Sequence, residues 1–140
     1  MELRQITEDY AVAPQILPED IPAIVEAGFK SVMCNRPDHE EPGQCAYDDV
    51  ARAAVEAGLE VRWIPIVSGM VTPQAMAEFE AALAEMPRPM LAYCRTGTRC
   101  TMLWTIAEFD RLGAEAVLQN TAAAGYDMAG LVSQLARQRG

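Results

Sequence analysis

The hydrophobic residues of this chain fall into short apolar runs and into longer segments with apolar positions at helical spacing. Short apolar runs predict strands, whereas apolar residues three and four positions apart predict amphipathic helices. Met90–Tyr93 is wholly apolar, which is typical of a strand in the middle of a sheet. We predict strands at Phe29–Cys34, Leu59–Ile64 and Met90–Tyr93, and a hairpin or edge strand in the mixed segments Met1–Ile6 and Tyr10–Ile16.

Prolines, glycines and capping residues mark where the helices begin and end. Thr72 followed by Pro73 is a strong start signal, because threonine caps a helix and proline fits its first position. Gly113 is placed to end the helix that follows Cys94. The predicted helices run from Pro18 to Gly28, from Asp48 or Asp49 to Gly58, from Pro73 to the break at Pro87, from the Cys94 loop to about Leu112, and over Ala114–Ala124 and Asp127–Arg137.

Strands separated by helices predict one α/β domain over residues 1–140. We expect three layers: a central, mostly parallel sheet of four to five strands with helices on both faces. Ligands of such sheets bind beyond the carboxyl ends of the strands, and Cys94 follows the strand Met90–Tyr93 directly. The segment Asn35–Asp49 is a long loop with two prolines and a glycine, and loops of this length are often functional.

Composition and charge exclude several classes of function. The net charge of −9 argues against nucleic acid or an anionic membrane as a partner, because both need a basic face. No apolar run approaches the roughly 20 residues of a membrane span, and the first residues lack an export signal, so we expect a cytoplasmic protein. The four cysteines form no CxxC pair and the chain has a single histidine, so we predict no metal site and no cofactor.

The segment Cys94-Arg95-Thr96-Gly97-Thr98-Arg99 has the composition of an anion-binding loop. Between a strand and a helix, the backbone N–H groups lack helical partners and gather positive charge, to which the helix dipole adds. Gly97 permits a positive φ in such a turn. A cysteine at a helix N-terminus beside cations has its pKa lowered from about 8.5 to roughly 3.5–7.5. We therefore predict Cys94 as a nucleophilic thiolate, with Arg95, Thr96, Gly97, Thr98, Arg99 and Cys100 surrounding a bound anion.

This loop matches the Cys-Arg-x-Gly-x-Arg pattern of rhodanese-type sulfurtransferases, and it resembles a shortened protein tyrosine phosphatase loop, Cys-x5-Arg. Nearly the whole chain resembles a small bacterial phosphatase-like family, which occurs alone or fused to metallo-β-lactamase-type persulfide dioxygenases. The matching segments outside the loop are Gln15–Asp20, Gly28–Val32, Asn35–Asp38, Ala57–Leu59, Ile64-Pro65 and Leu103-Trp104. The resemblance implies a fold like that of dual-specificity phosphatases, a role in sulfide detoxification and a persulfide dioxygenase as partner.

Departures from the phosphatase pattern favour sulfur transfer. Arg99 stands five residues after Cys94 rather than six, and Tyr93 stands where phosphatases usually have histidine. The loop Pro65–Thr72 has no Asp, Glu or His to protonate a leaving oxygen, whereas sulfur transfer needs no such acid. In favour of a phosphatase, Thr101 occupies the position of the hydroxyl that helps a phosphatase thiolate leave.

We therefore predict a sulfurtransferase in which Cys94 takes the sulfane sulfur of thiosulfate or a low-molecular-weight persulfide. The resulting Cys94 persulfide passes its sulfur to a thiophilic acceptor, a covalent mechanism in two half-reactions. The alternatives are a cysteine-dependent phosphatase of the tyrosine or dual-specificity type, and a non-catalytic thiol or persulfide sensor.

The sequence allows two roles for each of two residues near the loop. Cys100 either resolves a Cys94 persulfide or sulfenic acid into a disulfide, or is a small residue packed under the loop. Arg36, at the end of a predicted strand, either reaches the pocket or pairs with the acidic residues that follow it.

Overall fold

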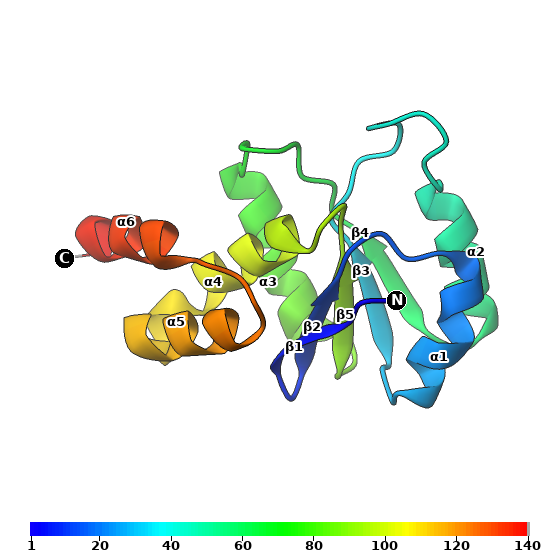
Figure 1. Cartoon of the computed structure of the whole chain (residues 1–140), viewed down its shortest axis with the longest axis horizontal. Coiled ribbons are helices and arrows are strands. Elements are labelled where there is room, and N and C mark those ends of the chain that lie inside the picture. Colours follow the sequence, from blue (N-terminus) through cyan, green and yellow to red (C-terminus); the bar gives the residue numbers. More distant parts are fainter. Residues whose placement is uncertain (140) are drawn as a thin grey trace.

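The computed structural model describes residues 1–139 and shows a single α/β domain built on a five-stranded sheet (Figure 1). The strand order is β1-β2-β5-β3-β4. The first strand is antiparallel to its neighbour, and the other four are parallel to one another. The strands are β1 (Arg4–Thr7), β2 (Tyr10–Ala13), β3 (Ser31–Cys34), β4 (Glu60–Trp63) and β5 (Met90–Tyr93).

Helices cover both faces of the sheet, which confirms the predicted three layers (Figure 1). One face carries α1 (Ile21–Glu26), which follows a short 3-10 turn at Pro18–Asp20, and α2 (Tyr47–Glu56). The other face carries α3 (Pro73–Glu85), α4 (Thr98–Leu112), α5 (Ala114–Ala123) and α6 (Ala129–Arg139).

The strand β5 lies at the centre of the sheet, as its apolar sequence predicts. Side chains alternate between the two faces, so Met90 and Ala92 pack under α3 and α4 while Leu91 and Tyr93 pack under α1 and α2. Cys94 continues this alternation and belongs to the core on the α3–α4 face. The carboxyl end of the central strand therefore places Cys94 beside the start of α4.

The predicted hairpin is confirmed, and one predicted helix cap is wrong. The strands β1 and β2 pair in antiparallel fashion with Thr7 opposite Tyr10, and β2 also pairs in parallel with β5, so only β1 is an edge strand on that side. Neither Asp48 nor Asp49 caps α2; Asp38 does so from the long loop, its Oδ1 accepting a hydrogen bond from the Tyr47 amide at 2.9 Å. A side chain distant in sequence replaces the adjacent cap, because the loop folds back on the helix.

The predicted boundaries of the two helices beside the site are confirmed. Thr72 caps α3 and accepts a hydrogen bond from the Ala75 amide at 3.1 Å, and α4 ends at Leu112 before Gly113. Within residues 1–139, no helix combines the length and apolar character that crossing a membrane requires. The cytoplasmic location stays a prediction.

Candidate active site

The loop after β5 turns tightly around the Cys94 sulfur. Gly97 has a φ of +90° and is the N-cap of α4, and its amide donates a hydrogen bond to Cys94 Sγ at 3.1 Å. Tyr126 covers the loop from outside, its hydroxyl donating to the Thr96 carbonyl at 3.0 Å. A Cβ on residue 97 would overlap that hydroxyl, so both the turn and the packing require glycine.

The pKa of the Cys94 thiol is lowered to about 5. The largest cause is a hydrogen bond from the Cys100 thiol, and the amides of Cys100, Thr96 and Gly97 add to it, while burial opposes them. The hydrogen bonds to Glu40 are the largest cause that raises the pKa of the Arg99 guanidinium, and the Cys94 sulfur, toward which Arg99 also donates, adds to it. At neutral pH Cys94 is therefore a thiolate, the reactive form of cysteine.

Cys100 lies in the first turn of α4 and is fully buried. Burial and the neighbouring Cys94 raise the pKa of the Cys100 thiol well above its ordinary value, so Cys100 keeps its proton and acts as donor. The residue is thus packed under the loop, which is one of the two roles that the sequence left open, and the resolving role stays a prediction.

Thr101 does not occupy the position expected of a hydroxyl that assists the thiolate. Its Oγ1 donates to the Gly97 carbonyl at 2.8 Å, one helical turn back, and the side chain is buried. Thr101 therefore fixes the turn that presents the loop amides, and the side-chain donor to the sulfur is Cys100.

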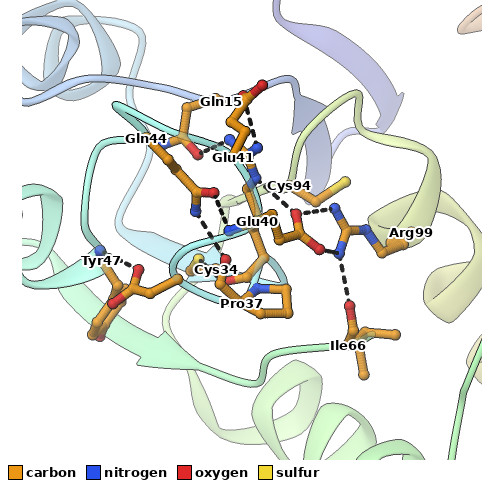
Figure 2. Close-up of polar contacts among 12 residues, drawn as sticks. Gln15, Cys34, Pro37, Glu40, Glu41, Gln44, Tyr47, Ile66, Cys94 and Arg99 are labelled. Carbon is orange, nitrogen blue, oxygen red and sulfur yellow. Dashed lines mark hydrogen bonds and ion pairs between the residues drawn. The ribbon is translucent and has the colours of Figure 1, made fainter. Parts of the chain in front are cut away.

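Arg99 is held in place by the long loop that precedes α2 (Figure 2). Glu40 binds its guanidinium with both carboxylate oxygens, at 2.7 and 2.8 Å, and the Ile66 carbonyl accepts a third hydrogen bond at 2.7 Å. Arg99 first and Arg36 second lower the pKa of the Glu40 carboxyl to about 2. Glu40 is therefore ionised at neutral pH.

Arg36 pairs with the acidic residues that follow it and lies outside the cavity beside the loop. Its Nε donates to Glu40 at 2.9 Å and its Nη2 donates to Glu41 at 2.9 Å. The third bond, also 2.9 Å, reaches the side-chain carbonyl of Gln15. Arg36 is 2% exposed, and it acts on the site by holding the Glu40 carboxylate in place.

A cavity of about 200 Å³ lies beside the loop. Its walls come from the loop and α4 on one side and from the segment between β4 and α3 on the other. The lining residues are Ile66, Ser68, Gly69, Val71, Arg95, Thr96, Thr98, Arg99 and Met102. Cys94 is 1% exposed and is not itself one of the lining residues, although Thr96 and Arg99, which contact its sulfur, are. Among the described residues that line the cavity, none is Asp, Glu or His.

Of the predicted residues 94–100, the structure brings Thr96, Gly97, Arg99 and Cys100 to the Cys94 sulfur, whereas Arg95 and Thr98 line the cavity beside the loop. Glu40, Glu41 and Gln15 join this site without having been predicted as site residues. The available signal was weak: Glu40 stands four positions after Arg36 in an acidic run, a pairing distance that also occurs on solvated surfaces. Within residues 1–139, no group of three or more His, Cys, Asp or Glu side chains is arranged to hold a metal ion.

The fold and the cysteine loop together define a phosphatase-like domain with a cysteine at the end of its central strand. A solved structure of a candidate phosphatase from Neisseria meningitidis superposes with a TM-score of 0.84 at 27% identity, covering 98% of each chain. The structure of PTPMT1 has the same fold, with a TM-score of 0.70 at 12% identity over 98% of this chain and 99% of that one. These similarities confirm the predicted fold class.

The chain belongs to the family described as beta-lactamase hydrolase-like protein, phosphatase-like domain, whose model matches residues 2–111. A beta-lactamase hydrolase-like protein of Agrobacterium fabrum is 34% identical over 108 residues, 77% of this chain. One from Xylella fastidiosa is 30% identical over 140 residues, 99% of this chain. The chain spans only 25% and 32% of the length of these two relatives.

Proposed function

We propose that this domain is a cysteine-dependent phosphatase that hydrolyses phosphate monoesters through a phosphorylated Cys94. The observation that carries the proposal is a thiolate with a pKa of about 5, surrounded by loop amides beside Arg99, on a phosphatase fold. The sequence favoured sulfur transfer; the comparisons support the phosphatase alternative better.

In the first step, the Cys94 sulfur attacks phosphorus and the bond from phosphorus to the ester oxygen breaks. The loop amides and the Arg99 guanidinium bind the phosphoryl oxygens as their charge is redistributed. In the second step, water attacks phosphorus, the phosphorus–sulfur bond breaks, and inorganic phosphate and the Cys94 thiolate are released. The Cys100 thiol stabilises that departing thiolate, which is the task expected of Thr101 from the sequence.

The site offers no side chain to protonate the leaving oxygen. The cavity-lining residues include no acid, and Glu40, the carboxylate that binds Arg99, is ionised because its pKa is about 2. The leaving group must therefore depart as an anion and take its proton from water. We expect kcat/KM to rise steeply as the pKa of the leaving alcohol falls.

The test compares p-nitrophenyl phosphate with an alkyl phosphate such as glycerol phosphate. We expect turnover of the aryl ester, little of the alkyl ester, and loss of both in Cys94→Ser. Cys45→Ser is the matched control, since Cys45 lies in the long loop with its thiol directed to the Ala46 carbonyl. Wild-type enzyme that hydrolyses neither ester, or Cys94→Ser at wild-type rate, would contradict the proposal.

Sulfur transfer is the second candidate, favoured by the position of Arg99 five residues after Cys94 and by the missing acid. Cys94 would attack the outer sulfur of thiosulfate, the sulfur–sulfur bond would break, and sulfite would leave. An acceptor such as cyanide would then remove the sulfur from the Cys94 persulfide. A persulfide dioxygenase as physiological partner belongs to this candidate.

Three readouts separate the candidates. Incubation with thiosulfate should add about 32 Da at Cys94, one sulfur atom, if this chemistry operates. Thiocyanate formation from thiosulfate and cyanide would favour the transferase, whereas the adduct without turnover would favour a sensor. If the protein hydrolyses esters but forms no adduct with thiosulfate or a persulfide, the phosphatase is the one candidate that fits.

A further inference from the structure

A groove of about 540 Å³ adjoins the cavity beside the loop, on the face of the sheet that carries α3, α4 and α6. The groove and the cavity share three lining residues, Gly69, Val71 and Met102, so they form one continuous depression. The other apolar residues that line the groove come from the three helices and are Pro73, Met76, Ile106, Leu131 and Leu135. A ligand whose anionic group occupies the cavity can therefore extend into the groove.

The groove follows one face of α4 away from Cys94. Thr98 lines the cavity, Met102 lines both the cavity and the groove, and Ile106 lines the groove. These three residues stand four positions apart, so their side chains form one row on the helix surface. At a rise of about 1.5 Å per residue, the row is about 12 Å long. This length suits an aromatic ring followed by a short alkyl group.

The lining of the groove is suited to an uncharged, apolar group. Five of its hydrophobic side chains pack only partly into the core and leave apolar surface open, namely Val71, Met76, Met102, Ile106 and Leu131. Val67 and Met70, in the segment between β4 and α3, are 58% and 64% exposed. Among the described residues that line the groove, the single charged one is Arg139, which pairs with Asp110 at 3.0 Å. Methionine also makes favourable contacts with aromatic rings.

The size of the cavity and the chemistry of the site both require a separate place for the leaving group. The cavity beside the loop has about 200 Å³, below the roughly 300–1,000 Å³ that is typical of small-molecule sites. It has room for a phosphoryl group and little more. Because no lining residue can protonate the leaving oxygen, the substrate needs an acidic alcohol such as a phenol.

We propose that the groove between α3, α4 and α6 binds the leaving group, and that the substrates are aryl phosphates with an apolar extension on the ring. This inference rests on the proposed phosphatase function and names its substrate class. The phosphoryl group binds the loop amides beside Arg99, the ring lies against Met102, and the extension continues along Ile106. The extension binds equally well before and in the transition state, so it lowers KM rather than raising kcat.

The test is calorimetry of Cys94→Ser protein with p-alkylphenyl phosphates, from the methyl to the hexyl compound. The phenols of this series have similar acidity, so only the length of the apolar group changes. Each methylene that enters the groove should lower Kd about fourfold, and inorganic phosphate should compete with every ester. Wild-type protein should show the same trend in KM with little change in kcat. A Kd that does not depend on length, or binding that phosphate does not weaken, would overturn the proposal.

Met76→Gln places a polar side chain in the groove, and Leu83→Gln is the matched control. Both residues are partly buried hydrophobic side chains of α3, but Leu83 lines a separate hollow with Tyr10 and Arg88. Met76→Gln should remove most of the difference in Kd between the methyl and hexyl esters, whereas Leu83→Gln should keep it. Ile106→Thr should act like Met76→Gln, and thermal unfolding shows which variants fold. A full dependence on length in folded Met76→Gln and Ile106→Thr would count against the groove.

Binding and turnover together separate this inference from the proposed function. Binding to Cys94→Ser that tightens with length, without hydrolysis by wild-type protein, supports the groove and contradicts the phosphatase. Hydrolysis of all the esters with one common KM supports the phosphatase and contradicts the groove. A dimer in light scattering that Met76→Gln dissociates would assign the groove to a second copy of the chain, and the proposal would then be wrong.

Discussion

Glu40 holds Arg99 with both carboxylate oxygens, at 2.7 and 2.8 Å, across 59 positions of the chain. The Glu40 oxygen that receives Arg99 Nη2 also receives Arg36 Nε, so one carboxylate joins two arginines. This pairing fixes the long loop against the anion-binding loop and leaves Arg99 in one orientation beside Cys94 (Figure 2).

Glu40→Gln should weaken both stability and the site. Hydrogen bonds to charged partners contribute about 1.5–3 kcal/mol, so we expect a loss in that range in urea unfolding, with a raised KM because Arg99 loses its anchor. Since folding lowers the pKa of Glu40 to about 2, its contribution is complete above pH 4.5 and declines as the pH falls toward 2. The variant should lack this acid dependence.

Glu41→Gln is the control for Glu40, because Glu41 pairs with Arg36 alone and its side chain is 48% exposed. We expect a smaller loss of stability and an unchanged KM. Equal effects of the two substitutions on KM would show that Glu40 does not position Arg99.

The thiolate of Cys94 should titrate with a midpoint near pH 5, seen as ultraviolet absorbance that Cys94→Ser lacks. Folding lowers this pKa from about 9, so the resulting stabilisation is complete above pH 9 and is lost as the pH falls toward 5. The stability difference between wild type and Cys94→Ser should therefore grow by about 1.4 kcal/mol per pH unit in this window. A flat difference would contradict a lowered pKa.

Comparing Cys100→Ala with Cys100→Ser should isolate the effect of the hydrogen bond from residue 100 on the pKa of Cys94. Alanine removes the largest cause of the lowered Cys94 pKa, so the midpoint should move toward the ordinary thiol value. Serine keeps a donor at the same position and should keep the midpoint near that of wild type. The same absorbance titration measures both, and coincident curves for alanine and wild type would exclude Cys100 as the main donor.

Gly97→Ala should distort the loop and reduce activity sharply. A residue other than glycine at a φ of +90° costs about 1–3 kcal/mol, and the new methyl would overlap the Tyr126 hydroxyl. Thermal unfolding measures the loss of stability, and the Cys94 titration measures the distortion of the loop. Gly130→Ala is the control: this α6 glycine has open space around its Cβ position, and we expect stability to rise by up to about 1 kcal/mol. Unchanged titration in Gly97→Ala would contradict the role of the turn.

The sequence by itself determined the α/β class, the central strand and the reactive loop. Met90–Tyr93 is wholly apolar, and Gly97 and Gly113 flank the helix α4 that follows Cys94. These features follow from local signals, because periodicity and turn chemistry act over a few residues. The candidate nucleophile and its amide cradle lie within seven consecutive residues, so no folding of distant segments is needed to recognise them.

Only the tertiary structure decided what surrounds the loop. Glu40 meets Arg99, Tyr126 covers Gly97, and Asp38 caps α2, all through contacts between segments distant in sequence. The donor role expected of Thr101 also falls to Cys100, because which of two adjacent helical side chains faces the sulfur depends on how α4 packs on the sheet. Periodicity places a residue on a helix face; the position of that helix against its neighbours determines what the face meets.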